Sequence, residues 1–115
     1  MQRTHAVLAG AGVDCGFTRV PGHPTITKLR IVSRHQQLIR LDFEEGFEGF
    51  DYGLFANQVE AVLPQVDVVV LSDYGKGVLS QARILIEMAR AQGKPVLVDP
   101  KSDDFGKYYG ASLIT

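Results

Sequence analysis

The chain has 115 residues, of which 45% are hydrophobic and 22% charged, a composition typical of one globular domain. Its 12 basic and 13 acidic residues give a net charge of -1, which provides no overall field for binding nucleic acid or an anionic membrane. Cys15 is the single cysteine, which excludes an internal disulfide and a zinc site made of cysteines. The start has no charged region followed by a long apolar stretch, and no 18 apolar residues run together, so we expect neither a secretory leader nor a membrane span. We therefore expect a cytoplasmic protein with no nucleic-acid or membrane partner.

The N-terminal part predicts a short helix and then a β-hairpin. Apolar residues 6–9 lead into Gly10 and Gly12, which is typical of a helix that ends at a glycine. Two β-rich segments follow at residues 25–33 and 36–44, joined by a short turn. The next stretch, residues 44–53, is rich in glycine and acid and is expected to form a loop.

Apolar and charged residues alternate in both segments, so the hairpin is expected to have one apolar and one charged face. A register that pairs Ile31 with Ile39 keeps the apolar residues together, and it places Arg30 opposite Arg40. Like charges in that position destabilise a hairpin unless an anion lies between them, which makes the two arginines candidates for a phosphate site. An ordinary solvated face, or a slip that pairs Arg30 with Asp42, stays open.

From residue 51 onward the pattern becomes α/β. Asp51 can cap a helix over residues 52–63 that Pro64 ends. The near-continuous apolar run at residues 66–73 is typical of a strand buried on both faces, and residues 80–92 form a helix with Ser80 as N-cap and Gly93 as stop. A second strand is expected at residues 94–101. These elements predict one β-α-β unit with parallel strands and a right-handed crossover.

The first strand ends in Asp73-Tyr74-Gly75-Lys76-Gly77, just before the helix. Ligands of open α/β sheets bind at the carboxyl ends of strands, and helix N-termini favour anions, so Lys76 is a candidate phosphate ligand. The stretch is not a P-loop, because Gly-x-x-x-x-Gly-Lys-Ser/Thr would need glycine at Val70 and a hydroxyl residue at Gly77. A tight turn with a solvated lysine is the alternative.

The second strand ends in similar chemistry, with Asp99 and Lys101. Two neighbouring parallel strands bring these residues and Asp73 and Lys76 to one edge of the sheet, where acids and lysines together suit phosphate and Mg²⁺. Strand ends are often polar simply because the chain leaves the core there, and this alternative stays open. The scattered histidines give no metal-ligand spacing. Tyr108 and Tyr109 are expected to cover the edge of the core.

Three long motifs resemble one family. The stretches HPTITKLRIVSRHQQLIRLDFEEGFEG, VLSDYGKGVL and VLVDPKSDDFGKYYGASLIT are similar, in this order, to the kinase domain of the bifunctional heptose-7-phosphate kinase/heptose-1-phosphate adenylyltransferases. That family belongs to the ribokinase-like sugar kinases. The resemblance covers nearly the whole chain.

The resemblance implies a partial ribokinase-like α/β domain over residues 1–115, with a β-hairpin lid at about 16–44 and a β-α-β part of the central sheet at about 66–101. It implies ATP and Mg²⁺ as cofactors and a sugar phosphate as substrate, with transfer of phosphate to the anomeric hydroxyl of D-glycero-β-D-manno-heptose 7-phosphate on the way to ADP-heptose and lipopolysaccharide. Candidate substrate-binding residues are Lys28, Arg30, Arg40, Asp73 and Lys76. Candidate nucleotide- and phosphate-binding residues are Asp99 and Lys101.

The chain also departs from this family. It has no Asp in a Gly-Ala-Gly-Asp context, the motif that supplies the general base, so no catalytic residue is assigned. It ends where the family continues with Pro-Asn-x-x-Glu, and Ser102 stands where glycine is usual. These departures imply an internal kinase segment that is inactive alone. The lid of ribokinase-like enzymes often contributes to dimer contacts, so the resemblance also implies a homodimer through the hairpin. A non-catalytic sugar-phosphate binding module, or a dimerisation fragment, stays open.

Overall fold

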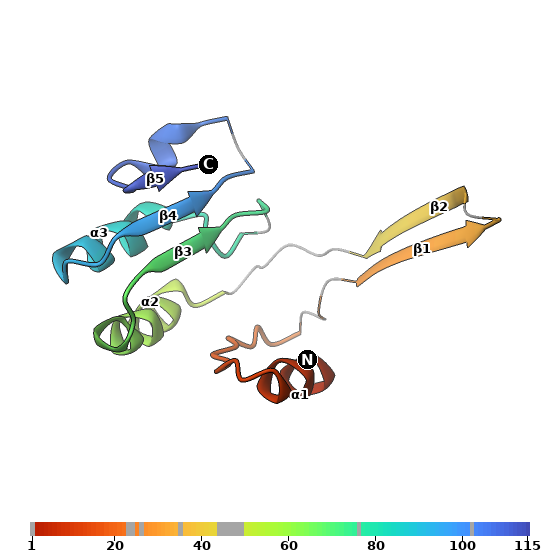
Figure 1. Cartoon of the computed structure of the whole chain (residues 1–115), viewed down its shortest axis with the longest axis horizontal. Helices are drawn as coiled ribbons and strands as arrows, with labels where there is room; N and C mark the ends of the chain where they lie inside the picture. Colours follow the sequence, from red (N-terminus) through yellow and green to blue (C-terminus); the bar gives the residue numbers. More distant parts are fainter. Residues whose placement is uncertain are drawn as a thin grey trace. The chain divides into compact units, whose positions relative to one another are not determined.

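The computed structural model describes residues 2–22, 25, 27–34, 36–43, 50–75, 77–101 and 103–115; for residues 2, 27–32 and 36–43 it describes the backbone alone. The chain forms two compact units, Met1–Gly49 and Phe50–Thr115, which are considered separately below (Figure 1). No helix in the described ranges is long and apolar enough to cross a membrane.

The first unit contains the predicted helix and hairpin. Helix α1 spans Gln2–Gly10, strand β1 spans Thr27–Ser33 and strand β2 spans Gln36–Phe43. The residue after α1 that takes a left-handed conformation is Gly12, with φ of 80°, in agreement with a helix closed by glycine. The short-helix and hairpin predictions are therefore confirmed.

The hairpin has the predicted register. The strands β1 and β2 are antiparallel, Ile31 pairs with Ile39, and Arg30 lies directly opposite Arg40. The register shifts between Ile31 and Val32, and Arg34 in the turn has a positive φ of 50°. One extra residue near the turn thus accommodates the short connection without disturbing the pairing of the arginines.

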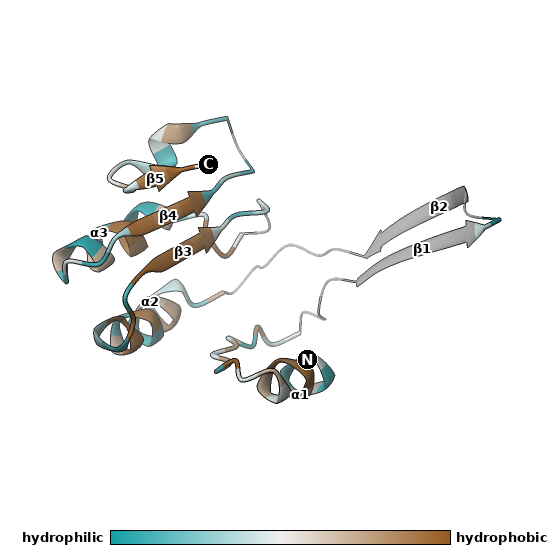
Figure 2. Ribbon diagram, viewed as in Figure 1, coloured by the Kyte–Doolittle hydropathy of each residue, from teal (hydrophilic) through white to brown (hydrophobic). Residues whose placement is uncertain are grey.

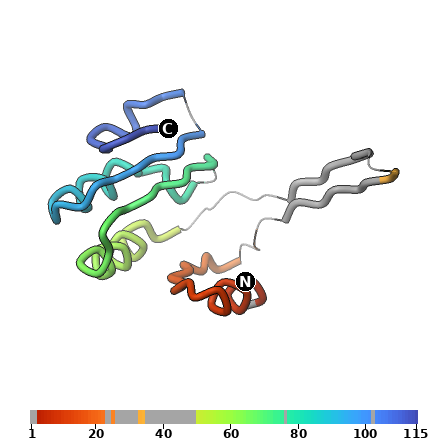
Figure 3. Tube along the Cα trace, in the orientation of Figure 1, coloured from red at the N-terminus to blue at the C-terminus, as the bar shows by residue number. Residues whose placement is uncertain are grey.

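The second unit is built around a small parallel sheet (Figures 1 and 3). Its elements are, in chain order, helix α2 (Tyr52–Val62), the 3-10 turn η1 (Leu63–Gln65), strand β3 (Val69–Ser72), helix α3 (Ala82–Ala91), strand β4 (Val96–Asp99), the 3-10 turn η2 (Phe105–Tyr108) and strand β5 (Leu113–Ile114). Strand β4 lies between β3 and β5 and is parallel to both. The predicted β-α-β unit is confirmed, and β5 is an addition that the sequence did not predict.

Three of the four predicted helix boundaries agree with the structure. The Asp51 side chain accepts a hydrogen bond from the backbone N–H of Leu54 and caps α2, and Gly93, with φ of 73°, follows the end of α3. Pro64 stops the α-helix but lies in the continuing turn η1. The prediction of Ser80 as N-cap is wrong: its N–H bonds to the carbonyl of Gly77 in a preceding turn, and α3 starts two residues later with Gln81 as N-cap.

The core lies on one face of the sheet. Leu71 of β3 and Val96 and Val98 of β4 share a buried cluster with side chains of α3 such as Leu85 and Ile86. The three strands are mostly hydrophobic (Figure 2), with Ser72 and Asp99 at the ends of β3 and β4, and burial alternates along these two strands.

The other face of the sheet carries an apolar row across the three strands. Leu97 pairs with Val70 on one side and with Leu113 on the other. Val70 is 61% exposed and Leu113 55% exposed. The expectation that the first strand is buried on both faces is therefore wrong within this chain, because the buried side chains of the helices contact one face only.

Gly110 fixes the segment between η2 and β5 on α3. It has a positive φ of 92°, and a Cβ atom there would lie 3.4 Å from Cγ2 of Ile86. The Arg90 guanidinium donates a hydrogen bond of 2.6 Å to the carbonyl of Gly110. Glycine adopts this left-handed backbone without strain, so it suits the segment that joins η2 to β5.

Candidate functional site

The ends of β3 and β4 meet as predicted. Ser72 pairs with Asp99, and the N–H of Asp73 donates to the carbonyl of Asp99 at 3.0 Å. The Lys101 side chain lies beside the turn that follows β3, since a Cβ atom on Gly75 would be 3.8 Å from its Cγ atom. The structure thus brings Asp73, Asp99 and Lys101 to one edge of the sheet, while Lys76 lies outside the described residues.

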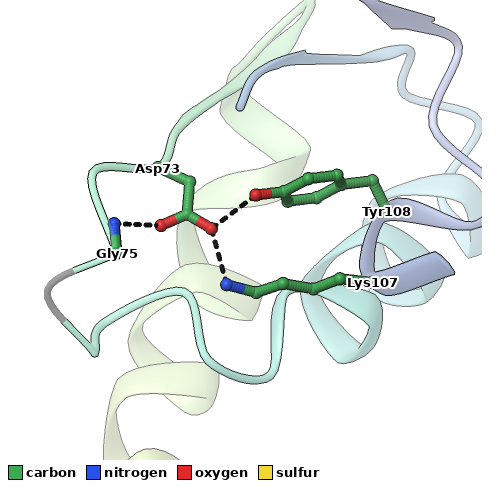
Figure 4. Close-up of polar contacts among 4 residues, drawn as sticks. All are labelled: Asp73, Gly75, Lys107 and Tyr108. Atoms are coloured by element: carbon green, nitrogen blue, oxygen red, sulfur yellow. Dashed lines mark hydrogen bonds and ion pairs between the residues drawn. The ribbon is translucent and has the colours of Figure 1, made fainter. Parts of the chain in front are cut away.

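Asp73 turns inward and is 5% exposed. One carboxylate oxygen, Oδ1, accepts the N–H of Gly75 at 2.8 Å, and the other, Oδ2, accepts from Nζ of Lys107 at 2.6 Å and from the hydroxyl of Tyr108 at 2.7 Å (Figure 4). We call these four residues the Asp73 cluster. The predicted substrate contact of Asp73 stays a prediction; within the described residues its carboxylate accepts hydrogen bonds from Gly75, Lys107 and Tyr108.

The turn after Asp73 depends on its glycines. Gly75 has φ of 69° and Gly77 φ of 107°, conformations that other residues adopt with strain. The hydrogen bond from the N–H of Gly75 to the carboxylate of Asp73, two residues earlier, forms an Asx-turn. Glycine is therefore the residue that fits both positions, and Lys76 stands between them in the sequence.

The Asp73 cluster changes the proton affinities of its members. Burial by itself raises the pKa of Asp73, but the hydrogen bonds from Lys107, Tyr108 and Gly75 outweigh it, so that the pKa lies below its ordinary value. Burial, and then the hydrogen bond to the carboxylate, raise the pKa of Tyr108 to about 12. At neutral pH Asp73 is therefore a carboxylate and Tyr108 a neutral phenol.

Asp99 and Lys101 are exposed, in contrast to Asp73. The Thr115 hydroxyl lies 3.5 Å from Oδ1 of Asp99 and donates to the carbonyl of Val98 at 3.3 Å. No three His, Cys, Asp or Glu side chains gather into a metal-binding group in the part of the chain that the structure describes. Among the described residues, this edge therefore presents the exposed carboxylate of Asp99 and the exposed side chain of Lys101 to solvent, a combination suited to a phosphate with its counterion.

The predicted hairpin cations belong to the other unit. The backbone register places Arg30 opposite Arg40 and Lys28 opposite Asp42. The side chains of these residues lie outside the described part of the structure. Their role as phosphate ligands stays a prediction.

Sequence reasoning missed Lys107 and Tyr108. These residues are 34 and 35 positions beyond Asp73, so no local spacing links them to it. Tyr108 was expected at the edge of the core and is instead 1% exposed, whereas Tyr109 is 71% exposed. The available signal was indirect: an Asp at the end of an apolar strand needs donors, and a Lys-Tyr pair preceding the next strand can supply them.

Comparison with known proteins gives long, close matches. The chain is 53% identical over 111 residues to the bifunctional protein HldE of Pectobacterium atrosepticum, which covers 96% of this chain. It is 56% identical over 108 residues to HldE of Aeromonas hydrophila and 55% identical over 108 residues to HldE of an Escherichia coli strain, in both cases 94% of this chain. The chain is a homologue of HldE.

The chain matches only part of each HldE relative. The 108 to 111 matched residues make up 23% of each of these HldE proteins, so the chain spans about a quarter of their length. No family profile matches the chain. Homology to HldE is therefore established over nearly all of this chain, and the activity of the complete protein is a separate question.

Proposed function

We propose that this chain is an internal segment of the kinase part of an HldE-type bifunctional enzyme. The reaction is transfer of the γ-phosphate of ATP to the anomeric hydroxyl of D-glycero-β-D-manno-heptose 7-phosphate, giving the 1,7-bisphosphate for ADP-heptose and lipopolysaccharide synthesis. The homology to HldE supports the bifunctional parent. The resemblance of three ordered motifs to ribokinase-like sugar kinases supports the choice of the kinase part.

The observation that carries the proposal is the meeting of two parallel strand ends at a glycine turn. Open α/β sheets bind ligands outside the carboxyl ends of their strands. At this edge the open cation Lys101 lies next to Gly75 in the turn that carries Lys76. We therefore assign Lys76 and Lys101 to phosphate groups, whose transfer needs mainly positioning and compensation of negative charge.

Asp99 is assigned to the Mg²⁺ and nucleotide side of the reaction. Mg²⁺ is commonly held through one or two carboxylates together with the phosphates of the nucleotide, and the exposed carboxylate of Asp99 beside the cationic edge fits that donor set. When bound, Mg²⁺ supplies positive charge to the phosphate oxygens. The chain's own contribution is to hold the nucleotide phosphates through Lys101 and to orient them.

The hairpin is assigned to the sugar phosphate. Lys28, Arg30 and Arg40 are proposed to bind the 7-phosphate from a lid of ribokinase type, because two arginines at paired positions of a hairpin suit a doubly charged phosphate. The apolar residues of the hairpin, including Ile31 and Ile39, are proposed as a homodimer contact. The general base is expected from another part of the parent protein, so the 115-residue chain alone is expected to be inactive.

Replacing Lys76 with Ala in the full-length parent is expected to lower kcat/KM for phosphoryl transfer by about 10- to 100-fold, since one charge-assisted bond to phosphate is lost. A coupled assay for ADP release measures the change. Lys94→Ala is the matched control, because Lys94 precedes the other end of β4. Unchanged kcat and KM for Lys76→Ala would remove Lys76 from the site.

A further inference from the structure

We propose that Lys107 and Tyr108 are positioning residues for phosphoryl transfer, acting through Asp73 on the glycine turn that carries Lys76. The proposal rests on the function proposed above. Its basis is the Asp73 cluster, in which one buried carboxylate joins the turn after β3 to the turn η2. Neither Lys107 nor Tyr108 is assigned to a ligand, and both act through the carboxylate.

The carboxylate of Asp73 anchors the glycine turn. Gly75 and Gly77 both lie in the left-handed region, and a turn with two such glycines has little rigidity of its own. The bond from the N–H of Gly75 to Oδ1 of Asp73 fixes the turn one residue before Lys76. The other oxygen of the same carboxylate is held by Lys107 and Tyr108, so the two donors set the orientation of the group that anchors the turn.

Lys107 also compensates the negative charge of Asp73. A carboxylate next to a phosphate site repels the phosphate and attracts the lysines that bind the phosphate, unless another cation neutralises the carboxylate. Lys107 makes the ion pair with Asp73 at 2.6 Å, and the Asp73 side chain is only 3% exposed. This pairing leaves Lys101 at the edge with its charge available to phosphate.

Stabilisation alone does not explain a buried ion pair at this position. Ion pairs of buried groups contribute little net stability compared with apolar residues of similar size, because removing both charges from water costs as much as the pairing gains. An apolar residue at position 73 could occupy the same buried position, but it could not accept a hydrogen bond from the N–H of Gly75. The geometry therefore points to orientation of the turn as the function of the cluster.

The experiment compares steady-state kinetics of Lys107→Met, Lys107→Arg and Tyr108→Phe in the full-length parent, with ATP and heptose 7-phosphate each varied. Lys107→Met is expected to lower kcat/KM by about 10- to 100-fold through misplacement of the turn and the uncompensated carboxylate. Lys107→Arg keeps the cation and is expected to restore activity to within about threefold of wild type. Tyr108→Phe removes a donor without changing charge and is expected to lower kcat more than it raises KM.

Two controls distinguish a misplaced turn from a general loss of folding. Arg83→Met removes a cation from the exposed face of α3 and is expected to leave kcat and KM unchanged. In the 115-residue chain, Tyr108→Phe is expected to move the amide resonance of Gly75 in a ¹⁵N–¹H spectrum while most other resonances stay. If Lys107→Met fails to fold, Tyr108→Phe and Lys107→Arg still give the comparison.

Wild-type kcat and KM in folded Lys107→Met and Tyr108→Phe, with an active wild-type enzyme, would overturn the positioning role alone. Equal losses in Lys107→Met and Lys107→Arg would also overturn it, since the retained cation should restore the turn. Absence of phosphoryl transfer by the wild-type enzyme would overturn the proposed function itself. The two failures are therefore distinguishable.

Discussion

Asp73→Asn is expected to lower the free energy of unfolding of the second unit by about 3 kcal/mol at neutral pH, the effect typical of breaking a buried ion pair from one side. The amide is close in shape to the carboxylate, but when its oxygen accepts the N–H of Gly75, its NH₂ group faces two further donors. These are the ammonium of Lys107 and the hydroxyl of Tyr108. Urea unfolding followed by circular dichroism measures the difference.

The same variant should change the dependence of stability on pH. The pKa of Asp73 is lower in the folded than in the unfolded chain, so its contribution is complete above the unfolded value of about 4 and is lost as the pH falls through the folded value. The pKa of Tyr108 is raised to about 12, so the contribution of its phenol is present below about pH 10 and is lost between about pH 10 and 12. Asp73→Asn should flatten the acid limb.

Asp103→Asn is the matched control, because Asp103 is an exposed acid of the segment that connects β4 to η2. Its stability is expected to stay within about 0.5 kcal/mol of wild type. An Asp73→Asn chain as stable as this control at pH 7 would mean that the cluster contributes nothing to the fold.

Ile86→Ala is expected to destabilise the second unit by about 3 to 4 kcal/mol, within the range for truncating a buried aliphatic side chain. Ile86 is fully buried, at 0% exposure, and belongs to the core cluster, so its truncation leaves a cavity there. A small unit has limited total stability, so this loss is expected to leave a large unfolded fraction at 37 °C. Thermal unfolding measures it.

Ile84→Ala provides the comparison on the same helix. Ile84 is 40% exposed, so its truncation is expected to lower the free energy of unfolding by less than about 1 kcal/mol. Similar losses for the two variants would contradict the assignment of the core to the Ile86 face of α3.

Patterns with a strong local cause were predictable from the sequence. The shared apolar face of Ile31 and Ile39 was predictable, because a one-residue slip puts apolar side chains against charged ones. The choice against the two-residue slip that pairs Arg30 with Asp42 came from the structure, which places Arg30 opposite Arg40. The α2 cap followed from Asp51, whose carboxylate satisfies a backbone N–H that the helix cannot. The meeting of Asp99 with the end of β3 followed from the parallel β-α-β arrangement.

Features decided by tertiary contacts were not predictable. Ser80 has the chemistry of an N-cap, but the turn at Gly77 delays the start of α3. Strand β5 has only two residues, too few for a periodic pattern, and depends on pairing with β4. The partners of Asp73 come from η2, and only folding brings them to the carboxylate.

Transfer of phosphate to the anomeric hydroxyl is tested most directly by incubating the full-length parent with Mg²⁺-ATP and heptose 7-phosphate and identifying the product by ³¹P NMR. The predicted result is ADP in proportion to sugar consumed, and a bisphosphate whose new phosphorus couples to the anomeric proton. Absence of sugar-dependent ADP, or a phosphate on a different hydroxyl, would contradict the proposed kinase function.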